Sequence, residues 1–116
     1  MQFLCLIYED ERLQASREEQ ENNKIFQQYM TFTEQVKTNG NFVAGDALLP
    51  TDTATTVRVR NNDTLLTDGP FAETKEQLGG YYLLECDSLD EAIKLAEKIP
   101  SAKFGSIEVR PIMVFE

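Results

Sequence analysis

Two stretches of the chain carry apolar residues at helical spacing, and each lies between runs that favour β-strands. The first covers roughly residues 16–40, and the second runs from about residue 88 to Pro100. A stripe at this spacing is typical of a helix that buries one face against a sheet. The stripes consist of Ile25, Phe26, Tyr29, Met30, Phe32 and Val36 in the first, and of Leu89, Ala92, Ile93, Ala96 and Ile99 in the second.

Both helices are expected to begin at a capping box, in which a serine is followed three residues later by a glutamate. Ser16 and Glu19 form one such pair, and Ser88 and Glu91 form the other. Gly40 is the expected end of the first helix. Residues 9–15 are then a polar connection.

The remaining apolar runs predict four strands and a β-hairpin. The strands are expected at 2–8, 42–46, 81–86 and 105–115, and the hairpin at 55–68 with its turn at residues 61–63. Without the hairpin, the order is strand, helix, strand, strand, helix, strand. This is the ferredoxin-like split βαβ plan of the α+β class, with both helices on one face of an antiparallel sheet. The other face is left bare.

The length of 116 residues and the 41% hydrophobic content predict a single domain, residues 1–116, with one modest core. A domain of this size leaves much of its surface exposed, so pairing with a second copy is a natural way to cover more of it.

The net charge of −9, from 20 acidic and 11 basic side chains, argues against direct nucleic-acid binding and against binding to anionic membranes. Met1 leads straight into a short strand-like run, and no apolar stretch predicts a membrane span or a signal peptide. We therefore expect a cytoplasmic protein.

The cysteine and histidine content limits the chemistry. Cys5 and Cys86 both lie in apolar runs, so we expect two buried thiols in a reducing compartment. The chain has no CxxC spacing and no histidine. We therefore expect no Cys/His metal site, no cofactor and no histidine general base.

The stretch 68–82, Asp-Gly-Pro-Phe-Ala-Glu-Thr-Lys-Glu-Gln-Leu-Gly-Gly-Tyr-Tyr, begins and ends at glycine-containing break signals. Its middle is too polar for a core and too varied for a flexible linker. We interpret it as an ordered loop, the kind of segment on which scaffolds tend to carry function.

Asp68 is the candidate catalytic residue. In one interpretation, its carboxylate accepts backbone hydrogen bonds in the turn that follows. In the other, Phe71 and Tyr81 wall it in, its pKa is raised, and it serves as an acid or base.

The candidate ligand-binding residues have similar alternatives. Glu73 and Lys75 either are solvated or orient a polar ligand. Tyr8 is either a strand-end aromatic or a hydroxyl that reaches the same site. Asp46 is either a turn acid or part of a pocket.

Arg58 and Arg110 lie on predicted strands with apolar neighbours. One interpretation is that they extend towards solvent or pair with acids such as Asp46 or Glu108. The other is that one of them presents its guanidinium fork to a ligand carboxylate.

The stretch DGPFAETKEQLGGYYLLECDSLDEA closely resembles the signature of the DGPF-domain branch of the YCII-related proteins. The resemblance extends to MQFLCLIYEDE, VAGDALLPTDTATTVRVRNNDTLLT and GSIEVRPIM. It implies a homodimeric α+β barrel in which two sheets pack face to face. A His-Asp pair proposed for the wider family cannot operate in a chain without histidine. The signature of this branch centres on Asp68 instead.

Three functions compete. The first is an enzyme or binder of a small polar metabolite, acting in a barrel cleft near the loop at 68–82. The second, implied by the resemblance, is a regulatory protein that partners an extracytoplasmic-function sigma factor. The third is a non-catalytic dimeric scaffold in which the loop only closes the barrel.

Overall fold

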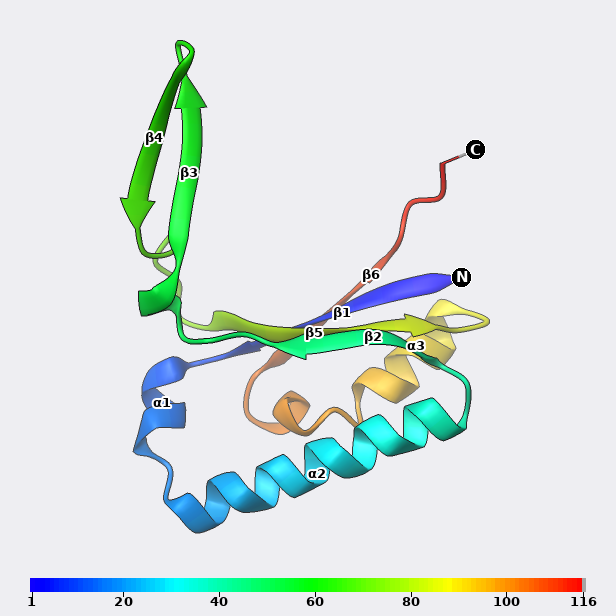
Figure 1. Cartoon of the computed structure of the whole chain (residues 1–116). Helices are drawn as coiled ribbons and strands as arrows, with labels where there is room; N and C mark the ends of the chain where they lie inside the picture. The colour runs from blue at the N-terminus through cyan, green and yellow to red at the C-terminus, as the bar shows by residue number, and fades with distance from the viewer. Residues whose placement is uncertain (116) are drawn as a thin grey trace.

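A computed structural model of the chain describes residues 1–115. Its centre is a four-stranded antiparallel sheet in the order β2-β5-β1-β6, and two main helices lie on one face of it (Figure 1). This order and connectivity confirm the ferredoxin-like plan of the α+β class. The strands are β1 (Gln2–Glu9), β2 (Phe42–Ala47), β5 (Gln77–Glu85) and β6 (Ser106–Pro111), and the main helices are α2 (Glu19–Thr38) and α3 (Leu89–Ala96).

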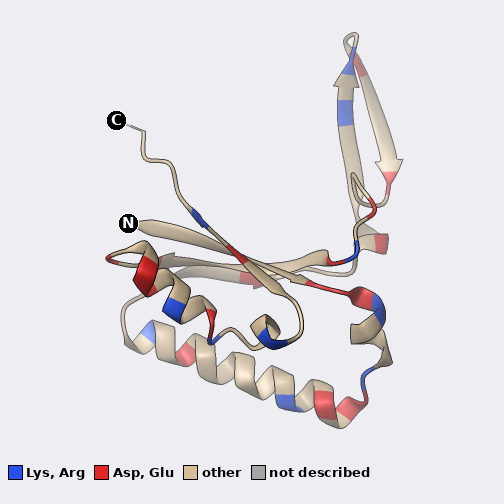
Figure 2. Ribbon diagram, turned by 180° about the vertical axis from the view of Figure 1, so that it is seen from behind, with Lys and Arg blue, Asp and Glu red and all other residues tan. Residues whose placement is uncertain are grey.

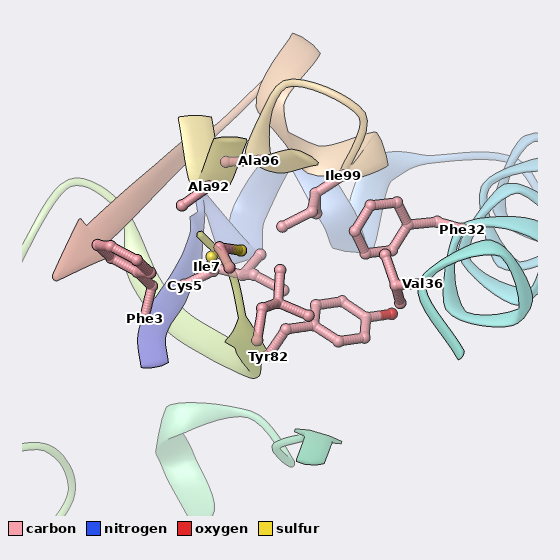
Figure 3. Packing of buried hydrophobic residues seen from close by; sticks show 11 residues of the cluster. Phe3, Cys5, Ile7, Phe32, Val36, Tyr82, Ala92, Ala96 and Ile99 are labelled. Atoms are coloured by element: carbon pink, nitrogen blue, oxygen red, sulfur yellow. The ribbon is translucent and has the colours of Figure 1, made fainter. Parts of the chain in front are cut away.

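The core fills the space between this sheet and the two helices (Figure 3). Alternate residues of β1 point towards the helices and are buried, because side chains along a strand alternate between its faces. Each large apolar side chain buried here stabilises the fold by roughly 1.5–3 kcal/mol relative to exposure. The buried cluster consists of Phe3, Cys5, Ile7, Phe32, Val36, Tyr82, Leu84, Cys86, Ala92, Ala96 and Ile99.

The start of the helical region differs from the sequence prediction. A separate short helix, α1 (Glu11–Ser16), occupies most of the expected polar connection, and the side chain of Asp10 caps it by accepting a hydrogen bond from the Arg12 amide at 2.9 Å. Residues 11–15 are mostly good helix formers, and the Asp10 cap stabilises their first turn. Ser16 therefore ends α1 and does not cap α2, which begins at Glu19.

The second capping box is confirmed at the start of α3. The Ser88 hydroxyl accepts a hydrogen bond from the Glu91 amide at 3.2 Å. The Glu91 carboxylate reaches back one residue further than in the standard motif and accepts from the Asp87 amide at 3.0 Å. The helix ends at Ala96, before Pro100, which starts a short 3-10 helix, η2 (Pro100–Lys103).

The hairpin is confirmed with both of its predicted ends. Strands β3 (Thr55–Arg60) and β4 (Asp63–Asp68) form a two-stranded sheet of their own. Asn61 and Asn62 turn the chain at positive φ, which asparagine tolerates better than most residues. The hairpin stands away from the main sheet on the side opposite the helices (Figure 1).

The expected loop at 68–82 is shorter than predicted, because β5 already begins at Gln77. Gly79 and Gly80 lie inside this strand and do not end a loop. A Cβ atom on Gly80 would lie 2.9 Å from the backbone oxygen of Asp46, so the glycine allows β2 to approach closely. The register of β1 with β5 also shifts here, between Ile7 and Tyr8.

The last strand is shorter than predicted as well. β6 ends at Pro111, which has no backbone N–H to continue a ladder, and only the Ile112 amide reaches back, to the Gln2 oxygen at 2.9 Å. Residues 112–115 form a tail that rises from the same side of the sheet as the hairpin, at the other end (Figures 1 and 2). The sheet face between the hairpin and the tail carries no helix, and we call it the open face.

Candidate functional site on the open face

The strand register determines which side chains share the open face. Asp46 lies beside Tyr81, Tyr81 beside Leu6, and Leu6 beside Glu108, so these four residues form a row across all four strands. The neighbouring row contains Ala44, Leu83, Leu4 and Arg110. The open face therefore has a floor of half-buried leucines with polar groups towards its two edges.

The polar group on the β2 side is a pair. The Tyr81 hydroxyl donates a hydrogen bond to Oδ2 of Asp46 at 2.6 Å. This hydrogen bond is the main reason why the pKa of Tyr81 is raised, because it favours the neutral phenol. No described residue donates to the other carboxylate oxygen, Oδ1, which leaves it available to a ligand.

The polar group on the β6 side consists of Tyr8, Glu108 and Arg110. The Tyr8 hydroxyl donates to Oε1 of Glu108 at 3.4 Å, across the diagonal of the β1–β6 pairing. Burial, followed by the charge of Glu108, raises the pKa of Tyr8, while the positive charge of Arg110 acts in the opposite direction. A phenol, a carboxylate and a guanidinium thus lie close together.

Four of the eight candidate residues from the sequence analysis are therefore on the open face: Tyr8, Asp46, Tyr81 and Arg110. The strand alternation of residues 106–111 could have indicated Glu108 as well, but only the register with β1 brings it to Tyr8. Neither Arg58 nor Arg110 forms an ion pair among the described residues, so the pairing with Asp46 or Glu108, one of the alternatives from the sequence, is not seen.

The other four candidates lie on the hairpin and in the loop that follows it. Asp68 is the last residue of β4, where it pairs with Thr55, and its side chain is exposed. The Asp68 carboxylate accepts no hydrogen bond from a described residue. Phe71 is 77% exposed and does not wall in Asp68. Arg58 donates to the Phe71 backbone oxygen at 3.3 Å.

The loop itself is held by its own side chains, as its composition suggested. The Thr74 hydroxyl donates to the Glu76 oxygen, and the Gln77 side chain donates to the Thr74 oxygen, both at 2.6 Å. Glu73 and Lys75 are exposed and form no hydrogen bond or ion pair with the open-face residues. A functional role for the four candidates on the hairpin and in the loop stays a prediction.

Two hollows on the surface of the described residues lie away from the open face. One hollow of about 400 Å³ lies along α2 and is lined by Lys24, Phe32 and Lys98 among others, and one of about 220 Å³ lies between α3 and β6. Because no helix covers the open face (Figure 1), a small molecule bound there would be enclosed only if a second protein surface covered it.

The two cysteines are buried free thiols, as expected. Burial raises the pKa of Cys5 to about 11 and also raises that of Cys86. Within residues 1–115, no cluster of three carboxylate or thiol side chains is arranged to hold a metal ion. Over the same residues, the helices are too short or too polar to cross a membrane.

The fold and the open face define a ferredoxin-like α+β protein in which one sheet face is covered by helices and the other carries polar side chains. The chain belongs to the YCII-related family, because the family model of the YCII-related domain matches residues 1–116. It is similar to an uncharacterised protein of Rhizobium meliloti (strain 1021), with 36% identity over 118 residues that cover 100% of this chain and 95% of that protein. The family-level resemblance is thus confirmed.

Proposed function

We propose that this chain is a cytoplasmic homodimer of the DGPF branch that binds a small polar molecule over the open face. The observation that carries this proposal is the presence of two phenols, two carboxylates and one guanidinium, in two groups, on a sheet face that no helix covers. Binding sites of this type combine apolar walls with a few placed polar groups, and the leucine floor supplies the apolar part.

The side chains indicate the class of ligand. A guanidinium fork such as that of Arg110 is suited to a carboxylate. The Tyr81 proton is already donated to Oδ2 of Asp46, so the remaining oxygen, Oδ1, suits a ligand hydroxyl that donates to it. Hydroxy acids and phenolic acids carry both of these groups, and Asp46 is the group that would take a proton from the ligand hydroxyl.

The proposed dimer follows from the bare sheet face. Half-buried Leu4, Leu6 and Leu83 would remain partly wet in a single chain, whereas a second sheet packed about 10 Å away would cover them. The polar groups at the edges would then line the space between two sheets. This arrangement agrees with the face-to-face barrel that the resemblance implies.

The test is a thermal-stability screen against small carboxylates and phenols. A ligand well above its dissociation constant should raise the apparent stability by about 2–4 kcal/mol. We expect hits that are lost in Asp46→Asn and Tyr81→Phe and are retained in Asp68→Asn, the matched control on the loop. Hits that instead survive the open-face variants and disappear in Asp68→Asn would move the site to the loop.

One observation favours the regulatory alternative. α2 exposes two large apolar side chains one turn apart, Phe26 at 61% and Met30 at 55%. Such a pair on an acidic chain suits a basic protein partner, of which a sigma factor is one example. A pull-down that recovers such a partner with the natural chain, and loses it with Phe26→Ser, would support this function.

A further inference from the structure

The hairpin β3–β4 has one face that is apolar and uncovered. The cross-strand register puts Val57 opposite Leu66 and Val59 opposite Thr64 on this face. Val57, Val59 and Leu66 are 60%, 59% and 68% exposed. The opposite face of the hairpin pairs Arg58 with Leu65.

The hairpin has little support from its own chain. Among the described residues, its hydrogen bonds to the rest of the chain reach only the segments next to it. The Gly69 amide donates to the Ala54 oxygen at 2.7 Å, the Thr56 hydroxyl donates to the Gly69 oxygen at 2.8 Å, and the Arg58 side chain donates to the Phe71 oxygen at 3.3 Å. An isolated two-stranded hairpin is marginally stable in water. A strip of β-branched and leucine side chains on such a hairpin therefore indicates an interface that another protein surface covers.

The position and length of the hairpin indicate that this surface belongs to a second copy of the chain. The hairpin rises on the same side as the open face (Figure 1). Its strands have six residues each, which corresponds to a height of roughly 20 Å. Two packed sheets are separated by about half that distance. A second copy seated on the open face would therefore be flanked by the hairpin over the full thickness of its sheet.

The charge distribution also favours a second copy. Residues 55–68 contain two arginines and two aspartates, so the hairpin is neutral in a chain whose net charge is −9. An acidic surface would be suited to a basic partner, whereas two copies of this chain repel each other except where their surfaces are neutral. The apolar, neutral hairpin is thus a surface on which the chain can meet itself.

We propose that the hairpin β3–β4 is an arm that clasps the second copy of the chain, with Val57, Val59 and Leu66 packed on that copy. This inference rests on the dimer proposed above. In a two-fold dimer each arm holds the other chain, so the contact occurs twice and every substitution in it counts twice.

Sedimentation of the double variant Val57→Ser/Val59→Ser tests the arm, with Leu65→Ser on the other hairpin face as the matched control. Because buried valines contribute on both copies, we expect the dimer dissociation constant to rise by about 100-fold or more in the double variant. Leu65→Ser should stay close to the natural chain. Circular dichroism checks that each variant folds, which we expect because the hairpin lies outside the core.

The outcomes are separable. If the double variant dimerises as tightly as the natural chain, the hairpin is not the clasping arm, although the dimer itself can still form. If Leu65→Ser weakens the dimer equally, the wrong face of the hairpin has been assigned to the contact. A natural chain that is monomeric at every concentration overturns both the arm and the dimer. As a second readout, trypsin should cut at Arg58 and Arg60 more slowly in the dimer, and equal cutting rates would contradict the clasp.

Discussion

The Tyr81 hydroxyl and the Asp46 carboxylate are joined by a 2.6 Å hydrogen bond across the pairing of β5 with β2. The two residues are 35 positions apart in the sequence. This bond fixes the phenol as a donor and directs the carboxylate over the open face. It is therefore the contact on which the proposed site depends most.

The substitution Asp46→Asn should lower the pKa of Tyr81. The raised pKa comes first from the hydrogen bond to Asp46, and the negative charge of Asp46 adds to it. An asparagine can still accept the bond but carries no charge. Titration of carbon-labelled tyrosine rings by NMR, with Tyr81→Phe to assign the signal, measures this. An unchanged Tyr81 titration in Asp46→Asn would contradict the pairing.

A buried polar network ties the end of β1 to α2 and η2. Arg17 donates to Oε1 of Glu9 at 3.1 Å, with both side chains less than 15% exposed, and the Ser101 hydroxyl donates to Oε2 of Glu9 at 2.6 Å. The single Ser101 proton goes to the carboxylate, so the Tyr29 hydroxyl must donate to Ser101.

Glu9→Gln should therefore destabilise the fold by about 2–4 kcal/mol, because it leaves Arg17 as a buried charge without its partner. Asp10→Asn is the matched control: its partner Arg12 is 86% exposed and stays hydrated when the carboxylate is lost, and asparagine still caps α1, so the expected cost is below about 1 kcal/mol. Urea unfolding of both variants gives the comparison. Equal losses would mean that the network is not structural.

Tyr29 should make the protein sensitive to alkali. Burial raises its pKa from 10.0 to about 12. The folded state therefore favours the neutral phenol, and this contribution is complete below pH 10 and is lost as the pH rises towards 12. The loss amounts to about 2–3 kcal/mol. Unfolding free energies of the natural chain should fall over this range more steeply than those of Tyr29→Phe, and parallel curves would contradict the assignment.

Gly105→Ala should be poorly tolerated. A Cβ atom there would lie 2.1 Å from the Tyr8 backbone oxygen and 3.2 Å from that of Ser101, and neither can move without disturbing β1 or η2. We expect a loss of at least about 1–3 kcal/mol. At Gly79 an added Cβ meets only the Ile7 oxygen at 4.0 Å, so Gly79→Ala should be neutral within about 0.5 kcal/mol or slightly stabilising. Thermal unfolding of Gly105→Ala and Gly79→Ala measures both losses, and equal losses would contradict the prediction.

The parts of the fold that local patterns determine could be predicted from the sequence. The hairpin at 55–68 alternates β-branched residues around an asparagine turn, and both of its ends were predicted. α1 was missed because its six residues have no apolar stripe, and its local signals are only the capping aspartate and a short run of good helix formers. Gly79 and Gly80 were interpreted as a break, whereas they lie inside β5, where Gly80 allows β2 to approach closely.

The candidate site was less predictable because it depends on register. Asp46, Tyr81 and Glu108 come from three separate strands, and a shift of one residue in any pairing would move its side chain to the helix-covered face. The sequence indicated Asp46, Tyr81, Tyr8 and Arg110 one at a time. Local patterns do not contain the information that the Asp46–Tyr81 pair forms, or that Glu108 reaches Tyr8.

The four tyrosines offer the most direct test of the proposed site, because two lie on each face of the sheet. Tyr8 and Tyr81 are on the open face, while Tyr29 and Tyr82 lie on the helix side. Carbon-labelled tyrosine rings should be followed by NMR as the best ligand from the stability screen is added. We predict that the Tyr8 and Tyr81 signals shift while those of Tyr29 and Tyr82 stay in place. Shifts confined to Tyr29 and Tyr82, or no shift at a saturating concentration, would contradict a site on the open face.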